Sequence, residues 1–177
     1  MPTLCRRCRG AKSMTAVRIN YRLFNIGVYL TAVVALVDQI SKWWALHVVF
    51  VDTDFVKVTP FLNLKMSWNK GVTFGFLSHY GDWMPYVLMV VTAAILLLLL
   101  AWLRRSTRLL TSLGLGFVMG GAIGNVIDRL QYSAVADFLD LHYASYHWYT
   151  FNVADSAIVL GVGCLLFENL LDNRKKR

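Results

Sequence analysis

Four of the nine aspartates in this chain lie within one stretch, residues 120–157, which reads GGAIGNVIDRLQYSAVADFLDLHYASYHWYTFNVADSA. They are Asp128, Asp137, Asp140 and Asp155. An apolar segment lies on each side of the stretch. Because a carboxylate is costly next to lipid, acids gathered between two apolar segments indicate a functional site.

Two aspartates held close together could hydrolyse a peptide bond without a metal ion or a covalent intermediate. Their charges repel, so one keeps its proton at a pH where the other is ionised, and the pair titrates as a unit. The ionised carboxylate then takes a proton from water while its partner donates one. Asp155 is the first candidate, because it stands at the start of the last apolar segment. The residues alone leave Asp128, Asp137 and Asp140 open as its partner.

Other catalytic patterns are weak or missing in the sequence. The histidines are scattered and give no HExxH spacing, so no zinc site is predicted: His47, His79, His142 and His147. No GxSxG, SxxK or P-loop pattern occurs. Cys5 and Cys8 have CxxC spacing without a second pair, and Cys164 in an apolar run is most simply a packed thiol. We therefore expect neither a metal nor a cofactor.

The composition indicates a membrane protein. The chain is 57% hydrophobic and only 16% charged, and its mean hydropathy is +0.51. Soluble domains are usually about 45–50% apolar and roughly 25% charged. The net charge of +8 could suggest nucleic acid, but the basic residues form three clusters beside apolar runs. That arrangement is typical of membrane proteins, so we expect no nucleic-acid partner.

Four apolar segments are candidate membrane spans: 23–46, 83–103, 109–127 and 157–171. A helix needs about 20 residues to cross a bilayer, and the last segment is the shortest. Asp38 and Lys42 in the first segment are spaced i,i+4 and can pair on one helical face. The third segment is rich in glycine, which favours close helix packing in lipid.

The region 48–80 has a different pattern. Aromatic, β-branched and polar residues alternate there, and Asn69-Lys70-Gly71 is a turn signal. We expect a small β-rich cap outside the membrane. Residues 1–22 form a basic extension, with Met14 as an alternative start and no cleavable signal peptide, and residues 172–177 form a basic tail.

The positive-inside rule then fixes the expected topology. With four spans, all three basic clusters lie in the cytoplasm, together with both termini. The cap and the segment 131–152, which we expect to be a loop, then share the outer face. Most of the acidic residues lie on that side, so any chemistry is expected there.

Five motifs together resemble the lipoprotein signal peptidase family, signal peptidase II. Three lie in the acidic stretch: GNVIDRL (124–130), VADF (135–138) and FNVADSAI (151–158). The other two are DQISK (38–42) and NKGVTF (69–74). The motifs occur in the family's order, and the match covers residues 23–171 as one four-helix membrane protease domain.

The resemblance implies an aspartyl endopeptidase of the bacterial inner membrane. Its substrates would be diacylglyceryl-modified prolipoproteins, cut just before the lipidated cysteine on the extracytoplasmic face. By the family pattern, Asp137 and Asp155 form the catalytic dyad. Other matched positions would line or support the substrate site: Asn69, Gly71, Asn125, Arg129 and Asn152. Asp38, Lys42 and Asp128 would hold the structure.

The resemblance also implies a β-cradle at 48–80 and a short surface helix near 75–82. We expect a monomer in contact with membrane lipid. Three alternatives remain: a small transporter or proton-relay protein that uses Asp38, Asp128 and Asp155, a structural assembly subunit, and another aspartyl intramembrane protease. A transporter predicts acids spread through the membrane and an inverted repeat, and neither pattern is seen here. A subunit would tolerate Asp→Asn changes, and the third class lacks its GxGD motif in these spans.

Overall fold

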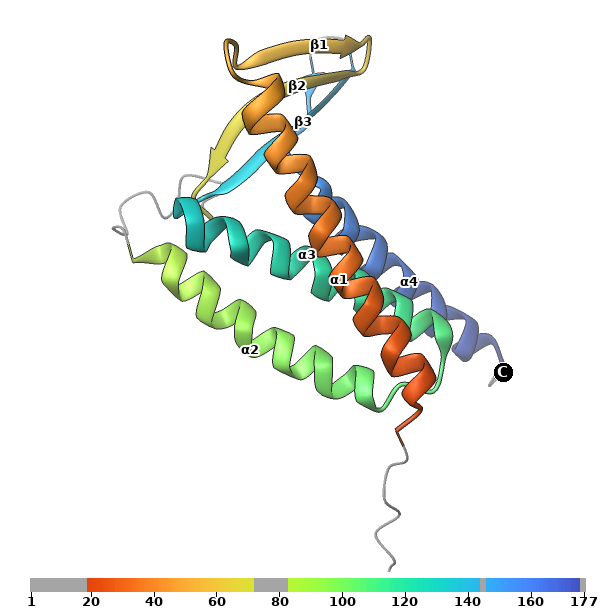
Figure 1. Ribbon diagram of the computed structural model, residues 1–177. Helices are drawn as coiled ribbons and strands as arrows, with labels where there is room; N and C mark the ends of the chain where they lie inside the picture. Colours follow the sequence, from red (N-terminus) through yellow and green to blue (C-terminus); the bar gives the residue numbers. More distant parts are fainter. Residues whose placement is uncertain (1–18, 72–82, 144–145, 176–177) are drawn as a thin grey trace, which may run out of the picture.

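Four long helices and a small antiparallel sheet make up this computed structural model (Figure 1), which describes residues 19–71, 83–143 and 146–175. The helices are α1 (Tyr21–Trp44), which continues as the π-helical turn η1 (Ala45–Val49), α2 (Met84–Arg104), α3 (Leu109–Tyr132) and α4 (Val153–Lys175). Each is long and apolar enough to cross a membrane. The four predicted spans are therefore confirmed as helices.

Two helices extend beyond their predicted bounds toward the acidic stretch. We expected the third span to end near residue 127 and the fourth to begin at 157. Instead α3 runs to Tyr132, and α4 begins at Val153. Asp128 therefore lies inside α3, and Asp155 lies in the first turn of α4. A hydropathy pattern ends a span at the first charged residue. Here Asp128 is buried and paired with Lys42 inside α3, and half-buried Asp155 is hydrogen-bonded in the first turn of α4.

The central helix is α3, which packs against α1, α2 and α4. Glycines bring the backbones close together: a Cβ at Gly116 would lie 2.9 Å from the carbonyl oxygen of Gly27, and one at Gly114 would lie 2.9 Å from that of Gly161. Small residues at such crossings are the usual means of helix association in lipid. The predicted close packing of the third span is confirmed.

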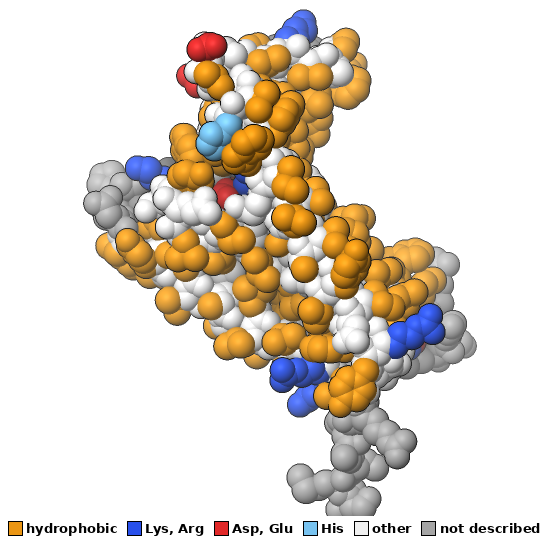
Figure 2. Space-filling model, viewed as in Figure 1, with side chains coloured by type: hydrophobic (Ala, Val, Ile, Leu, Met, Phe, Trp, Pro, Cys, Tyr) orange, Lys and Arg blue, Asp and Glu red, His pale blue; other side chains and the backbone are white. Residues whose placement is uncertain are grey.

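Hydrophobic side chains predominate on the face of the helical body seen in Figure 2. In α2 only 6% of the most apolar window is buried inside the protein, compared with 50% in α3. The surface of α2 is therefore suited to contact with lipid. The last turn of α4 and the connection between α2 and α3 lie at the end of the body away from the sheet (Figure 1).

The sheet contains β1 (Phe55–Thr59), β2 (Leu62–Asn69), β3 (Val135–Tyr143) and β4 (Tyr146–His147), paired antiparallel in that order. The first two strands lie in the predicted cap region. The other two come from the segment that we expected to be a loop. That expectation was wrong because β3 pairs with β2, a strand far away in the sequence. No hairpin turn joins the two strands, so the local sequence does not indicate the pairing. The short helix expected near 75–82 lies outside the described residues.

A buried lysine between two carboxylates joins α1 to α3. Lys42 Nζ lies 2.8 Å from Asp38 Oδ2, one turn earlier in α1, and 2.8 Å from Asp128 Oδ2 in α3. All three side chains are at most 3% exposed. The predicted pair of Asp38 and Lys42 is confirmed, and the basic partner of Asp128 is Lys42.

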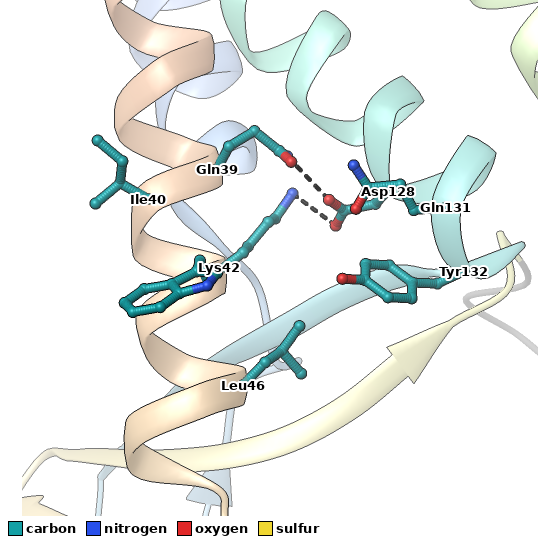
Figure 3. Close-up of a pocket in the computed structure, with 8 residues that line it drawn as sticks. Gln39, Ile40, Lys42, Leu46, Asp128, Gln131 and Tyr132 are labelled. Atoms are coloured by element: carbon teal, nitrogen blue, oxygen red, sulfur yellow. Dashed lines mark hydrogen bonds and ion pairs between the residues drawn. The ribbon is translucent and has the colours of Figure 1, made fainter.

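The same carboxylates also hold the starts of two other elements. Asp38 Oδ1 accepts a hydrogen bond from the backbone N–H of Ala154 (2.8 Å) in α4, where the helix dipole favours negative charge. Asp128 Oδ2 accepts one from the N–H of Ala136 (3.0 Å) in β3. Gln39 donates to Asp128 Oδ1 (3.0 Å) beside a cavity of about 310 Å³ (Figure 3). This cluster therefore links α1, α3, α4 and β3 at one place.

Replacement of the lysine tests the importance of this cluster. We expect Lys42→Met to destabilise the protein by about 3–5 kcal/mol, because it leaves two buried carboxylates without their cation. Thermal unfolding in detergent micelles measures the loss. Lys65→Met, the same change at an exposed site on β2, is the matched control. Equal unfolding temperatures for the two variants would contradict this role of Lys42.

Candidate active site

The two aspartates expected to be catalytic come from different elements that meet at the sheet end of the helical body. Asp137 is the third residue of β3, and Asp155 lies in the first turn of α4. A sharp turn positions β3. Ser133, the residue that caps the C-terminus of α3, has the left-handed conformation (φ 56°), and β3 begins two residues later. The strand therefore starts beside the end of α3.

Asp155 is held by the start of its own helix. Asn152 immediately precedes α4, and its Oδ1 accepts a hydrogen bond from the backbone N–H of Asp155 (2.9 Å). In return, Asp155 Oδ2 accepts one from the backbone N–H of Asn152 (3.3 Å). This reciprocal arrangement is a capping box, in which an asparagine and an aspartate satisfy two N–H groups of the first turn. The two hydrogen bonds between Asn152 and Asp155 therefore fix the direction of the Asp155 carboxylate.

Two asparagine side chains bridge the acids. Asn152 Nδ2 donates to Asp137 Oδ1 (2.7 Å) and to Asn125 Oδ1 (3.2 Å). Asn125 Nδ2 donates to Asp155 Oδ1 (2.9 Å), and its oxygen also accepts from Lys42 Nζ (3.1 Å). Asn152 is fully buried and Asn125 is 9% exposed. Asn152 therefore supports the acids from behind and does not line an open surface.

The other oxygen of Asp137 is bound from β2. Asn69 Nδ2 donates to Asp137 Oδ2 (3.1 Å), and Asn69 Oδ1 accepts from the backbone N–H of Gly71 (2.8 Å). Gly71 has a φ of +89°, which a glycine adopts readily. The predicted turn at Asn69-Lys70-Gly71 is thus present, and it orients the amide that reaches Asp137.

Burial and charge together raise the pKa of Asp137. The side chain is 2% exposed, and this desolvation, followed by the negative charge of Asp155, raises its pKa to about 6. The hydrogen bonds from Asn69 and Asn152 and the charge of Lys42 act in the opposite direction. Asp137 can therefore hold a proton closer to neutral pH than an ordinary aspartate does.

Of the three possible partners of Asp155, the structure brings Asp137 to it. Asp128 is bound by Lys42, and Asp140 accepts hydrogen bonds from Asn63 and His147. Asp137 is joined to Asp155 through Asn152, and its pKa responds to the charge of Asp155. Among the described residues, no three His, Cys, Asp or Glu side chains gather as metal ligands.

Arg129 lies one helical turn after Asn125 on α3. Its Nη1 donates to the backbone oxygen of Asn125 (3.4 Å), and its Nε is buried without a hydrogen-bond partner among the described residues. The guanidinium is attracted electrostatically by three nearby carboxylates, those of Asp155, Asp128 and Asp137. Arg129 therefore brings unused donors to the neighbourhood of the two acids.

A cavity opens beside each acid. The cavity beside Asp155 is apolar, measures about 630 Å³, and is lined by Leu141, Trp148, Phe151, Asp155, Ser156, Val159 and Leu160. The cavity beside Asp137 is more polar, measures about 340 Å³, and is lined by Ser67, Trp68, Asn69, Lys70, Asp137, Tyr149 and Thr150. The two acids therefore face surroundings of different polarity.

Sequence reasoning missed one polar group near the site. Asn63 of β2 and His147 of β4 both bind the buried carboxylate of Asp140, which lies opposite Asn63 in the sheet. The segment 142–150 carries no motif that we identified, and its aromatic residues suggested only an interfacial lid. The contacts depend on the pairing of β3 with β2 and β4, which the sequence does not reveal.

Comparison with known proteins gives a consistent result. The model of the family described as signal peptidase (SPase) II matches residues 30–171. The lipoprotein signal peptidase of Rhodopseudomonas palustris (strain ATCC BAA-98 / CGA009) is 40% identical over 152 residues, covering 83% of this chain and 93% of that protein. The enzyme of the same name from Coxiella burnetii (strain Dugway 5J108-111) is 40% identical over 151 residues, covering 84% and 92%.

Two solved structures, each described as a bacterial membrane enzyme, share the fold. One has a TM-score of 0.74 and 26% identity, covering 86% of this chain and 92% of the other. The second has a TM-score of 0.72 and 28% identity, covering 82% and 93%. The family model spans most of the chain, including all the residues that hold the two acids. This chain therefore belongs to the signal peptidase II family.

Proposed function

We propose that this chain is an aspartic endopeptidase that removes the signal peptide from diacylglyceryl-modified prolipoproteins, cutting just before the lipidated cysteine. The observation that carries the proposal is the pair of buried Asp137 on β3 and half-buried Asp155 at the start of α4, which two asparagines bridge. The name of the relatives, lipoprotein signal peptidase, supports the substrate class.

In the proposed reaction the two carboxyl groups share one proton. Asp137 carries that proton, because burial and the neighbouring charge of Asp155 raise its pKa. Ionised Asp155 takes a proton from water, and the hydroxide adds to the scissile carbonyl carbon while Asp137 protonates the carbonyl oxygen. The tetrahedral intermediate then collapses, and a proton passes to the leaving amine. The products are a signal peptide with a new carboxylate and a lipidated cysteine with a free α-amine.

The two cavities suit the two chemical parts of such a substrate. The apolar cavity beside Asp155 continues along α4 and can take acyl chains or apolar side chains. The polar cavity beside Asp137 can take the backbone near the cleavage site. The half-buried guanidinium of Arg129, which makes one long hydrogen bond to the Asn125 oxygen, can also hold a substrate carbonyl oxygen or a lipid ester.

We place the active site on the extracytoplasmic face of the bacterial inner membrane. The arginines at the end of α2 and in the connection to α3 lie away from the sheet end, and basic residues favour the cytoplasmic side. Both termini would then be cytoplasmic. We further propose that the enzyme works as a monomer without a metal or other cofactor.

Cleavage of a purified substrate tests the proposed dyad. We expect wild-type protein in detergent to remove the signal peptide from a diacylglyceryl-modified prolipoprotein, with or without a chelator. Asp137→Asn and Asp155→Asn should each lower the rate by about 10²–10⁴-fold, because each removes one partner in proton transfer. Asp52→Asn, the same change at an exposed residue, is the matched control. Near-normal cleavage by either dyad variant would contradict the assignment.

The coupling between the acids can be measured directly. We expect Asp155→Asn to lower the pKa of Asp137 from about 6, because the variant removes a negative charge that raises it. The pKa should remain above its ordinary value, since burial, the larger cause, is unchanged. The infrared band of the protonated carboxyl group, followed against pH, reports the change, and its loss in Asp137→Asn identifies it. An unchanged titration in Asp155→Asn would show that the acids are not coupled.

The role of Arg129 predicts a change in substrate binding. Arg129→Gln should raise KM several-fold, because the unused guanidinium donors would no longer meet the substrate. Steady-state kinetics with the lipidated prolipoprotein measure KM and kcat separately. Arg105→Gln, at an exposed site next to the end of α2, serves as the control. A KM for Arg129→Gln equal to that of the control would refute the proposed contact.

A further inference from the structure

Asp140 is a buried acid outside the proposed dyad, and it ties three strands together. Its side chain is 2% exposed. Asn63 Nδ2 on β2 donates to Asp140 Oδ2 (3.0 Å), and His147 Nδ1 on β4 lies 3.0 Å and 2.9 Å from the two carboxylate oxygens. The mechanism proposed above uses none of these three side chains.

The strand that carries His147 has few other attachments. β4 is two residues long and pairs only with the end of β3, His147 opposite His142 and Tyr146 opposite Tyr143. After β4 the chain returns along β3, with Trp148 N–H donating to the Leu141 oxygen (2.7 Å) and Phe151 bonded to Leu139 in both directions. We call residues 146–151 the return segment. The side-chain contact between His147 and Asp140 fastens its beginning.

The return segment contributes to both cavities of the proposed site. Trp148 lines the apolar cavity together with Asp155, and Tyr149 and Thr150 line the polar cavity together with Asp137. Two residues lie between Trp148 and Phe151, whereas one lies between their partners on β3, Leu141 and Leu139. One residue is therefore extra, and the segment bulges at Tyr149 and Thr150. A shift of the return segment would therefore change the walls of both cavities at once.

Burial and polar contacts act in opposite directions on the pKa of Asp140. Burial alone would raise the pKa of Asp140, but the hydrogen bonds from Asn63 and His147 and the charges of His147 and His142 hold it below its ordinary value. The titratable groups that face His147 are Asp140 and His142, both on β3, and β2 contributes the uncharged Asn63. The His142 ring stacks on His147 at a centroid distance of 5.1 Å, and its two nitrogens are buried without partners among the described residues.

We propose that the contact between Asp140 and His147 is a positioning device that holds the return segment in its substrate-binding place and thereby sets KM for the lipidated prolipoprotein. This inference rests on the function proposed above. A hydrogen bond to an ionised carboxylate is stronger than one between two neutral groups.

Steady-state kinetics on the full-length protein in detergent test the proposal. His147→Ala should raise KM roughly tenfold at pH 6, since it removes a hydrogen bond to a buried charge, and kcat should stay within about twofold. His147→Gln keeps a neutral N–H donor, so its KM should be intermediate.

A matched histidine provides the control. His47 in η1 is exposed and contacts Trp43 one turn earlier, away from the return segment, so His47→Gln should leave KM as in wild type. The proposal is overturned if His147→Gln behaves like His47→Gln. It is also overturned if His147→Ala lowers kcat and leaves KM unchanged.

A second measurement does not depend on catalysis. Amide hydrogen exchange of the return segment, at Trp148 and Phe151 above all, should be faster in His147→Ala than in wild type or His47→Gln. Unchanged exchange in His147→Ala overturns the positioning role. If wild-type protein never cleaves the prolipoprotein, the proposed function fails, and faster exchange in this variant would still establish the contact as the hold on the segment.

Discussion

A positive charge buried between two carboxylates is the constraint on which the rest of the structure depends. Lys42 can remain charged away from water only because Asp38 and Asp128 surround it, and each acid also accepts a backbone N–H from a further element. One network therefore fixes the mutual positions of three helices and the first residues of β3. The same lysine binds Asn125 Oδ1, which turns the Asn125 amide nitrogen toward Asp155.

This indirect link has a chemical consequence. A cation in direct contact with both Asp137 and Asp155 would favour the ionised form of each, and no proton would remain to be shared. Amide groups donate hydrogen bonds without bringing a charge. The asparagines therefore fix the geometry of the acids while burial and mutual repulsion keep the pKa of Asp137 raised. The lysine therefore supports the site through Asn125, and the acid pair remains able to hold a proton.

The sequence predicted the elements that depend on local patterns and missed those that depend on distant pairing. Runs of apolar residues identified all four helices, and an i,i+4 spacing identified the pair of Asp38 and Lys42. The helix ends were wrong because Asp128 and Asp155 are polar residues that are satisfied inside or at the start of helices.

We expected a loop at β3. Its partner strand β2 lies more than sixty residues earlier in the chain, so no local pattern indicates that the two segments pair. For the same reason, the residue types left the partner of Asp155 open. Only the family resemblance indicated Asp137, and the fold brings it next to Asp155. The contacts of Asp140 with Asn63 and His147 could not be predicted without the register of that sheet.

The central claim is that the two acids activate water directly and form no bond to the substrate. A single turnover of lipidated prolipoprotein in water enriched in ¹⁸O, with enzyme in excess, tests it by mass spectrometry. We expect one ¹⁸O atom in the new carboxylate of the released signal peptide and none in Asp137 or Asp155. Label in either aspartate after one turnover would mean that a carboxylate had attacked the substrate, and it would contradict the proposed mechanism.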